Sequence, residues 1–275
     1  MLKLPGKAPE GVVLISLRER ESGRVLIVGH RGAEALAPEN TWASLKAGCE
    51  SGADMLEVDV QLTSDGEAIV FHDYTLQPKF GDPRWVRDLA WAELRAFDVG
   101  RWFAPRFAGE RIPRLADVLA WARERVALWV DLKHGFVEHD DDGLEKAAVE
   151  MIVECSMIDQ VVVSSWDQVA LSRIRVRYPR IPLAVNLRPR VPDPVSLIRP
   201  TGASWVAVWW PQIDRETVAR LQAGGLTVCL TNLFTADYAE AYRLGVDAVT
   251  AEDPSVARTA LVASRCDQER RMPHD

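Results

Sequence analysis

Short apolar runs alternate with amphipathic stretches along most of the chain. Each apolar run has the length expected of a strand that is buried on both faces. Eight runs of this kind are present, at Arg24–Gly29, Asp54–Val60, Val126–Lys133, Gln160–Ser164, Pro182–Leu187, Ser204–Val208, Leu226–Thr231 and Val246–Thr250. The intervening stretches predict helices at Trp42–Ser51, Leu115–Arg125, Leu144–Met157, Gln168–Tyr178, Pro194–Arg199, Arg215–Ala223 and Ala236–Leu244. In the first of these, Asn40 or Thr41 serves as N-cap and Gly52 ends the helix.

This strand–helix rhythm predicts a parallel sheet. Eight strand–helix units in a chain of 275 residues indicate an α/β TIM (β/α)8 barrel. The functional groups of such a barrel stand at the carboxyl ends of its strands. An open doubly wound sheet is the alternative, but the chain has no glycine-rich nucleotide loop.

One further apolar run, Ala68–His72, does not fit the parallel pattern. Only a tight turn at Thr63–Gly66 separates it from the Asp54–Val60 strand, whereas a parallel crossover needs about a dozen residues. We therefore expect Ala68–His72 to fold back antiparallel and to bring His72 over the barrel mouth.

The stretch from about residue 74 to 113 has no strand–helix rhythm but is rich in tryptophan and phenylalanine. A disordered linker would not carry so many aromatic residues. It is expected to form a small cap, inserted after the His72 hairpin, that limits substrate size. We expect one domain over 1–275, with a hairpin joining Gly11–Leu17 to Arg24–Val28 and a frayed polar tail at 265–275.

Charge, cysteine spacing and the lengths of the apolar runs exclude several classes of protein. The net charge of −7 argues against a nucleic-acid-binding surface, which would be basic. The four cysteines show no paired spacing and predict reduced thiols and no zinc site. The apolar run at 12–15 is shorter than a signal peptide needs, and no run approaches the roughly 18 apolar residues of a membrane helix, so we expect neither. We expect a cytoplasmic protein without stable membrane insertion; its oligomeric state stays open.

Candidate chemistry begins with Glu57 and Asp59. Side chains along a strand repeat every two residues, so both carboxylates point to one face, about 7 Å apart. Their apolar neighbours indicate a buried strand, where two unpaired carboxylates would be very costly. A divalent metal ion bound by both acids resolves that cost, and hard cations such as Ca²⁺ or Mg²⁺ prefer oxygen ligands. A solvent-facing pair is the alternative.

Two histidines and an arginine flank this acidic strand. His30 and His72 are candidates for general acid and base, because imidazole titrates near neutral pH. Arg31 suits phosphate binding, since its planar fork matches phosphate oxygens. Together these groups are suited to cleaving a phosphodiester with a bound metal ion. The residues do not decide which histidine is the acid.

The same residues resemble the glycerophosphodiester phosphodiesterase family, within the PLC-like phosphodiesterases. The family motif runs HRG, PENT, E-x-D, DG and HD, and each part is present in order: His30-Arg31-Gly32, Pro38-Glu39-Asn40-Thr41, Glu57/Asp59, Asp65-Gly66 and His72-Asp73. The cap resembles the family insertion through its run from Gly100 to Leu115. The resemblance covers about residues 24–256 and weakens after Lys133.

The resemblance implies further roles. The family has E-x-K where this chain has Asp131-Leu132-Lys133, which implies a metal ligand at Asp131 and a phosphate contact at Lys133. Asn232 matches a family asparagine in the substrate pocket. The chain departs from the family at Cys229-Leu230, where an aromatic is usual, and at Ala251-Glu252, where the family has Thr-Asp. Three tryptophans are candidates for core packing or for a substrate-facing wall: Trp205, Trp209 and Trp210.

The resemblance implies a phosphoric diester hydrolase, EC 3.1.4.46, that needs one divalent ion, Ca²⁺ or Mg²⁺. It would release glycerol 3-phosphate and an alcohol from a small-molecule glycerophosphodiester. Three alternatives stay open: cleavage or cyclisation of lysophospholipids, a silent binding barrel, and a sugar-phosphate aldolase or isomerase. The head group, the choice of ion and the role of the cap are not decided by the sequence.

Overall fold

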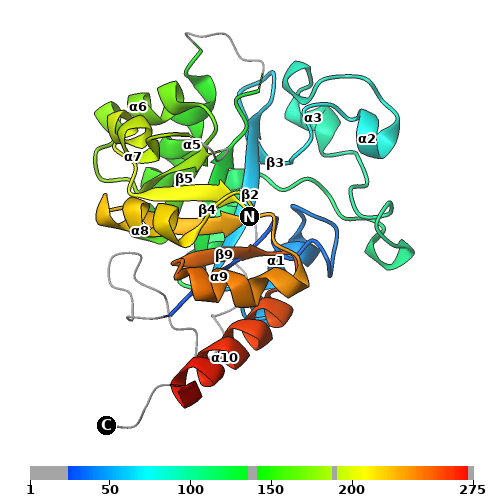
Figure 1. Ribbon diagram of the computed structural model, residues 1–275. Coiled ribbons are helices and arrows are strands. Elements are labelled where there is room, and N and C mark those ends of the chain that lie inside the picture. Colours follow the sequence, from blue (N-terminus) through cyan, green and yellow to red (C-terminus); the bar gives the residue numbers. More distant parts are fainter. Residues whose placement is uncertain (1–23, 136–140, 188–190, 272–275) are drawn as a thin grey trace.

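A computed structural model of the chain describes residues 24–135, 141–187 and 191–271. Within these ranges, eight parallel strands close into a barrel (Figure 1). The barrel strands are β1 (Leu26–Gly29), β2 (Met55–Leu62), β4 (Ala127–Leu132), β5 (Val161–Ser165), β6 (Leu183–Leu187), β7 (Trp205–Trp209), β8 (Thr227–Thr231) and β9 (Ala248–Ala251). Each pairs with the next in this order, and β1 closes the ring by pairing with both β9 and β2. The predicted TIM barrel is confirmed.

Helices cover the outside of the barrel, as Figure 1 shows. They are α1 (Trp42–Glu50), α4 (Leu115–Ala122), α5 (Gly143–Glu154), α6 (Gln168–Arg177), α7 (Pro194–Ile198), α8 (Arg215–Ala223), α9 (Tyr238–Leu244) and α10 (Pro254–Arg271). Among the described residues, five single 3-10 turns lie at Val86–Asp88, Pro105–Phe107, Ile158–Gln160, Arg199–Thr201 and Thr235–Asp237. Thr41 caps α1 by accepting a hydrogen bond from the backbone N–H of Ser44 at 3.3 Å. In the described part of the chain, no helix is long and apolar enough to cross a membrane.

The carboxyl-terminal helix α10 corrects one sequence expectation. The segment 265–275 was expected to be frayed because it is polar, but α10 continues to Arg271. Its first turns bury Ala257 and Leu261 in the outer core, so packing rather than amphipathic pattern holds it. The expected partner strand at Gly11–Leu17 lies outside the described residues.

Two cores stabilise the barrel. The larger lies between the strands and the helices and is mostly aliphatic. The smaller fills the barrel interior with alanine, valine and a few larger aliphatic residues and with two tryptophans, Trp129 and Trp205, whose rings meet edge to face at 5.7 Å. Cys229, which stands where the family usually has an aromatic, belongs to this interior core. The two tryptophans supply bulk there, so a small residue at 229 is compatible with a filled barrel.

The hairpin and the insertion follow β2. Strand β3 (Ala68–Val70) pairs antiparallel with β2, as predicted from the short turn. The inserted segment continues with α2 (Gln77–Phe80) and α3 (Trp91–Leu94) and lies beside the barrel (Figure 1). It has an apolar core of its own, formed by Ile69, Phe71, Leu76, Val86, Leu89, Leu94, Val99 and Ile112. This core holds the segment against the hairpin that ends at His72.

Candidate active site

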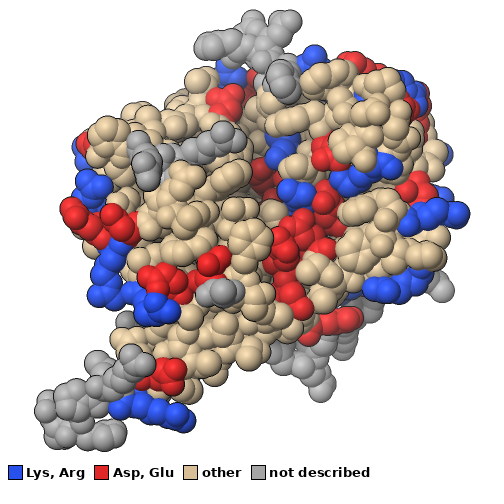
Figure 2. All heavy atoms as spheres, turned by 45° about the vertical axis from the view of Figure 1, so that its right-hand side comes forward, with Lys and Arg blue, Asp and Glu red and all other residues tan. Residues whose placement is uncertain are grey.

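A pocket of about 370 Å³ opens at the carboxyl ends of the barrel strands. Most predicted site residues line it: His30, Arg31, Glu57, Asp59, His72, Asp131, Lys133, Trp209 and Asn232. A larger hollow of about 470 Å³ beside α8 has no histidine among its lining residues. Figure 2 shows acidic side chains gathered near the middle of one face with basic side chains beside them. The pocket is therefore the place where the predicted chemistry converges.

The acidic centre of the pocket is built by β2 and β4. Glu57 and Asp59 both face inward from β2, and parallel pairing sets Asp59 directly beside Asp131 of β4. Oxygen atoms of these three carboxylates lie within 4.8 Å of one another. All three residues are buried, with exposed fractions of 3 to 6%. Such a cluster can hold a metal ion.

Hydrogen bonds fix each carboxylate. The backbone N–H of Arg31 donates to Glu57 at 2.8 Å, and the Asn40 amide donates to Asp59 at 2.8 Å. The hydroxyl of Ser164 and the amide of Asn186 donate to one oxygen of Asp131 at 2.7 and 2.6 Å. A centre held in this way is preorganised.

The three acids differ in proton affinity. Burial raises the pKa of Glu57 to about 8, and the charge of Asp59 adds to the shift. Burial would also raise the pKa of Asp59, but the charges of Lys133, His72 and Arg31 lower it far below its usual range. The pKa of Asp131 is raised by burial. Without a cation the cluster therefore favours a proton on Glu57, because adjacent carboxylates repel.

Two basic side chains border the acids. Nζ of Lys133 lies 3.4 Å from Asp59 and 3.7 Å from Asp131. Arg31 has a left-handed backbone, with φ of 48°, which turns the chain sharply after β1. Its Nε is buried and has no hydrogen-bond partner among the described residues, although Asp59 lies 3.4 Å away. This ion pair holds the guanidinium of Arg31 at the edge of the acidic centre.

Both histidines present Nδ1 to a carboxylate. Nδ1 of His30 lies 2.5 Å from Glu34, and Nδ1 of His72 lies 2.9 Å from Asp73. Burial would lower the pKa of His30, but the hydrogen bond to Glu34 and the charge of Glu57 raise it to about 9. The Nε2 nitrogens remain for exchange with a substrate, since a carboxylate holds each Nδ1–H.

The tryptophans do not share one role. Trp209 lines the pocket at the end of β7 and meets Trp166 edge to face at 6.1 Å. Trp205 begins the same strand, about 13 Å lower in the barrel, and belongs to the interior core. Trp210 faces the other way and packs on the outer core. For Trp205 the structure fits the core-packing alternative, because strand position and not residue type decides depth in the barrel.

Several pocket or contact residues were not predicted from the sequence. Asn186 had a usable signal, as a polar side chain near the end of the apolar run 182–187. Asn40 and Glu39 stood in the PENT motif but were assigned only to the turn. Glu34 and Trp166 had no recognisable signal. No residue of 74–113 lines this pocket, but Tyr74 and Trp85 line a neighbouring hollow of about 320 Å³ that shares Lys133 with it. That the inserted segment limits substrate size stays a prediction.

The chain resembles known proteins over most of its length. The profile of the glycerophosphoryl diester phosphodiesterase family matches residues 30–256. YhdW of Bacillus subtilis is 31% identical over 83% of this chain and 94% of its own length. A glycerophosphodiester phosphodiesterase of Caldanaerobacter subterraneus is 28% identical, over 84% and 95%. The solved structure of an Oleispira antarctica phosphodiesterase in complex with the product sn-glycerol-3-phosphate matches with a TM-score of 0.80 at 24% identity, over 86% of this chain and 96% of that one.

Proposed function

Because the chain belongs to the glycerophosphoryl diester phosphodiesterase family, we propose that it hydrolyses glycerophosphodiesters to glycerol 3-phosphate and an alcohol. The observation that carries the proposal is the convergence of two imidazoles, three carboxylates, Arg31 and Lys133 in one pocket. The relative from Caldanaerobacter carries the same activity in its name, and the Oleispira phosphodiesterase holds glycerol 3-phosphate as product. Both support a small-molecule phosphodiester as substrate.

The donor set fits one hard divalent cation. Glu57, Asp59 and Asp131 offer only oxygen atoms, which Ca²⁺ and Mg²⁺ prefer over nitrogen or sulfur. Burial and the charge of Asp59 raise the pKa of Glu57, and a cation between the acids would favour its ionised form against both effects. When bound, the ion supplies Lewis-acid stabilisation of charge on the phosphoryl oxygens.

The chain's own cations orient the phosphate. The guanidinium of Arg31 and the ammonium of Lys133 line the pocket beside the acidic centre, where such groups bind phosphate oxygens. Their charges offset the repulsion between the anionic diester and the acidic pocket. Asn232, which also has a left-handed backbone with φ of 61°, is assigned to the rim that contacts the organic part of the substrate.

The two histidines move the protons. One imidazole takes the proton of the attacking nucleophile through Nε2 while the other gives a proton to the oxygen of the leaving alcohol. Glu34 and Asp73 hold the rings by Nδ1 and stabilise the imidazolium form.

Lysophospholipids are a second substrate class with one observation in their favour. Two apolar side chains near the pocket are exposed: Trp166, which lines it, is 42% exposed, and Phe234, which follows the lining residue Leu233 in the chain, is 67% exposed. An acyl chain leaving the pocket can lie on such side chains. Small glycerophosphodiesters remain the preferred substrate class, because they need no contact with apolar side chains outside the pocket.

A metal-replacement assay tests the proposal. Protein stripped with a chelator is refilled with Ca²⁺ or Mg²⁺ and assayed with glycerophosphocholine, glycerophosphoethanolamine and a lysophospholipid. We expect turnover only after refilling, with glycerol 3-phosphate as product. A cyclic phosphate product would indicate attack by the substrate's own hydroxyl. Full activity in thoroughly stripped protein would exclude the metal site, and no turnover of any diester would exclude the function.

A further inference from the structure

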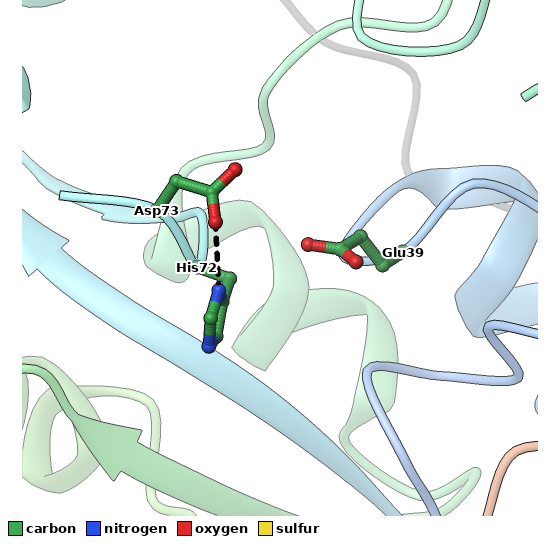
Figure 3. Close-up of side chains that lie close together, drawn as sticks. All are labelled: Glu39, His72 and Asp73. Carbon is green, nitrogen blue, oxygen red and sulfur yellow. Dashed lines mark hydrogen bonds and ion pairs between the residues drawn. The ribbon is translucent and has the colours of Figure 1, made fainter. Parts of the chain in front are cut away.

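Beyond the pocket lining, a lysine of the inserted segment reaches the carboxylate that holds His72. Asp73 accepts from Nδ1 of His72 with one oxygen and pairs with Nζ of Lys79 through the other. The same Nζ lies 3.0 Å from Oε1 of Glu39, which precedes α1. Figure 3 shows the carboxylates of Asp73 and Glu39 facing the same space from opposite segments. Lys79 thus bridges two acids that would otherwise repel.

The ammonium of Lys79 is held from several sides. It lies 5.3 Å from the ring centre of Phe71 and 5.5 Å from that of Trp102. The side chain is 11% exposed, so its charge is largely removed from water. A desolvated ammonium between two rings and two carboxylates has little freedom to move. Burial would raise the pKa of Asp73, but the hydrogen bonds to His72 and Lys79 lower it to about 2, so Asp73 is ionised.

The contacts continue from Glu39 to the second histidine. Oε2 of Glu39 accepts from Nη1 of Arg31 at 2.9 Å. The same Nη1 lies 3.5 Å from Glu34, whose other oxygen meets Nδ1 of His30. Positive and negative groups therefore alternate from one Nδ1 to the other, through Asp73, Lys79, Glu39, Arg31 and Glu34.

We propose that Lys79 is a positioning residue of the phosphodiesterase reaction, which holds Asp73 on His72 and Glu39 on Arg31. The proposal rests on the proposed function. It gives the inserted segment a role although none of its residues lines the pocket. Glu39, His72 and Asp73 also form a cluster of metal-ligand type, but the ammonium of Lys79 already supplies the positive charge there.

The test compares Lys79→Met with Lys79→Arg. Methionine keeps the apolar stem between the rings and removes the charge, whereas arginine keeps the charge. We expect Lys79→Met to lower kcat about 10- to 100-fold, the usual scale for a lost outer contact, with KM and metal affinity nearly unchanged. Lys79→Arg should recover part of the loss. Lys46→Met is the matched control, because Lys46 is exposed on α1.

A second readout does not depend on turnover. Nitrogen NMR of the imidazoles reports which ring nitrogen of His72 carries the proton, and we expect Lys79→Met to change that signal. If the wild-type protein turns over no diester, the proposed function fails. The NMR signal of His72 still shows whether Lys79 positions Asp73. An unchanged kcat and an unchanged His72 signal in Lys79→Met overturn the proposal. If that variant does not fold, Glu39→Gln tests the same contact with Lys79 in place.

Discussion

At the scale of single residues, one kind of side chain serves different purposes according to its partners. His30 and His72 each meet a carboxylate and line the pocket. His134 follows directly after Lys133 in sequence, yet it is buried between Ser165 and Glu145 and does not line that pocket. The environment of a histidine therefore separates a candidate catalyst from a structural group.

The His30→Ala and His72→Ala variants should each lose turnover. We expect kcat to fall by at least about 10²-fold, the scale of general acid–base catalysis, with little change in thermal stability. A p-nitrophenyl diester, whose leaving group needs no proton, should partly restore the variant that lacks the acid. That comparison assigns acid and base. Undiminished kcat in both variants would place the proton transfers elsewhere.

The buried pair of Glu145 and His134 predicts a pH-dependent contribution to stability. Burial would raise the pKa of Glu145, but hydrogen bonds from His134, its own backbone N–H and Arg173 lower it. A lowered pKa means that the contribution is present above the usual value, about 4.3, and is lost as pH falls through the folded-state pKa. Glu145→Gln should cost about 1–3 kcal/mol at pH 7.

The measurement is urea unfolding of wild type and Glu145→Gln from pH 7 to pH 3. The difference between them should shrink as the pH falls below the usual glutamate value of about 4.3, because the unfolded chain then binds a proton that folded Glu145 does not. Arg177→Gln is a suitable control, since its ion pair with Asp142 is half exposed and worth little. A difference that stays constant with pH would contradict the assignment.

At the scale of elements, the turn after β1 is held by close packing with α1. This turn carries His30 and Arg31. A Cβ atom at Gly48 of α1 would lie 2.6 Å from the carbonyl oxygen of Gly32 and 2.5 Å from Cδ2 of Leu56. The hydroxyl of Ser44 accepts from Ala33 N–H at 2.8 Å and donates to the Arg31 carbonyl at 2.7 Å. The packing of α1 therefore fixes the position of the turn that carries His30 and Arg31.

Gly48→Ala should lower both stability and turnover. Overpacking costs about 1–3 kcal/mol, and the gain in helix propensity, about 1 kcal/mol, offsets only part because a backbone carbonyl is in the way. The displaced turn should also reduce kcat. Lys46→Ala on the exposed side of α1 is the control and should leave both unchanged. Equal stability of Gly48→Ala and wild type would show that α1 can move without cost.

At the scale of the whole molecule, barrel closure gathers residues that are distant in the chain. Asp131 and Asn186 are 55 residues apart and share a hydrogen bond of 2.6 Å. With a net charge of −7, the surface as a whole does not attract an anionic substrate. Attraction has to come from the local cations of the pocket and from a bound ion.

A bound ion should also stabilise the whole barrel. Because the three carboxylates converge only in the folded state, an ion that binds there stabilises it by about 2.7 kcal/mol at a concentration of 100 Kd. Thermal unfolding with Ca²⁺ or Mg²⁺ against chelator should show a higher Tm. The Asp131→Asn variant should lose most of this difference. An equal rise in Tm for that variant would place the ion elsewhere.

The local sequence pattern was sufficient to predict most helices and strands and the shared orientation of Glu57 and Asp59. Alternation along a strand placed Glu57 and Asp59 on one face, and the short turn at Thr63–Gly66 predicted the antiparallel return of β3. Both depend only on neighbours in the chain. Helix α10 was missed because its polar last turns carry no periodic signal, while its packing against the barrel is a long-range effect.

The sequence by itself determined which groups carry chemistry and that a parallel barrel would bring strand ends together, since period and motif are local properties. Tertiary structure alone decided how deep each side chain lies in the barrel and which side chains contact one another. It placed Trp205 in the interior and Trp209 in the pocket. It also brought Glu34 and Lys79 to the carboxylate and arginine network behind the histidines. Such contacts depend on how a turn bends and how an insertion packs, which residue spacing does not encode.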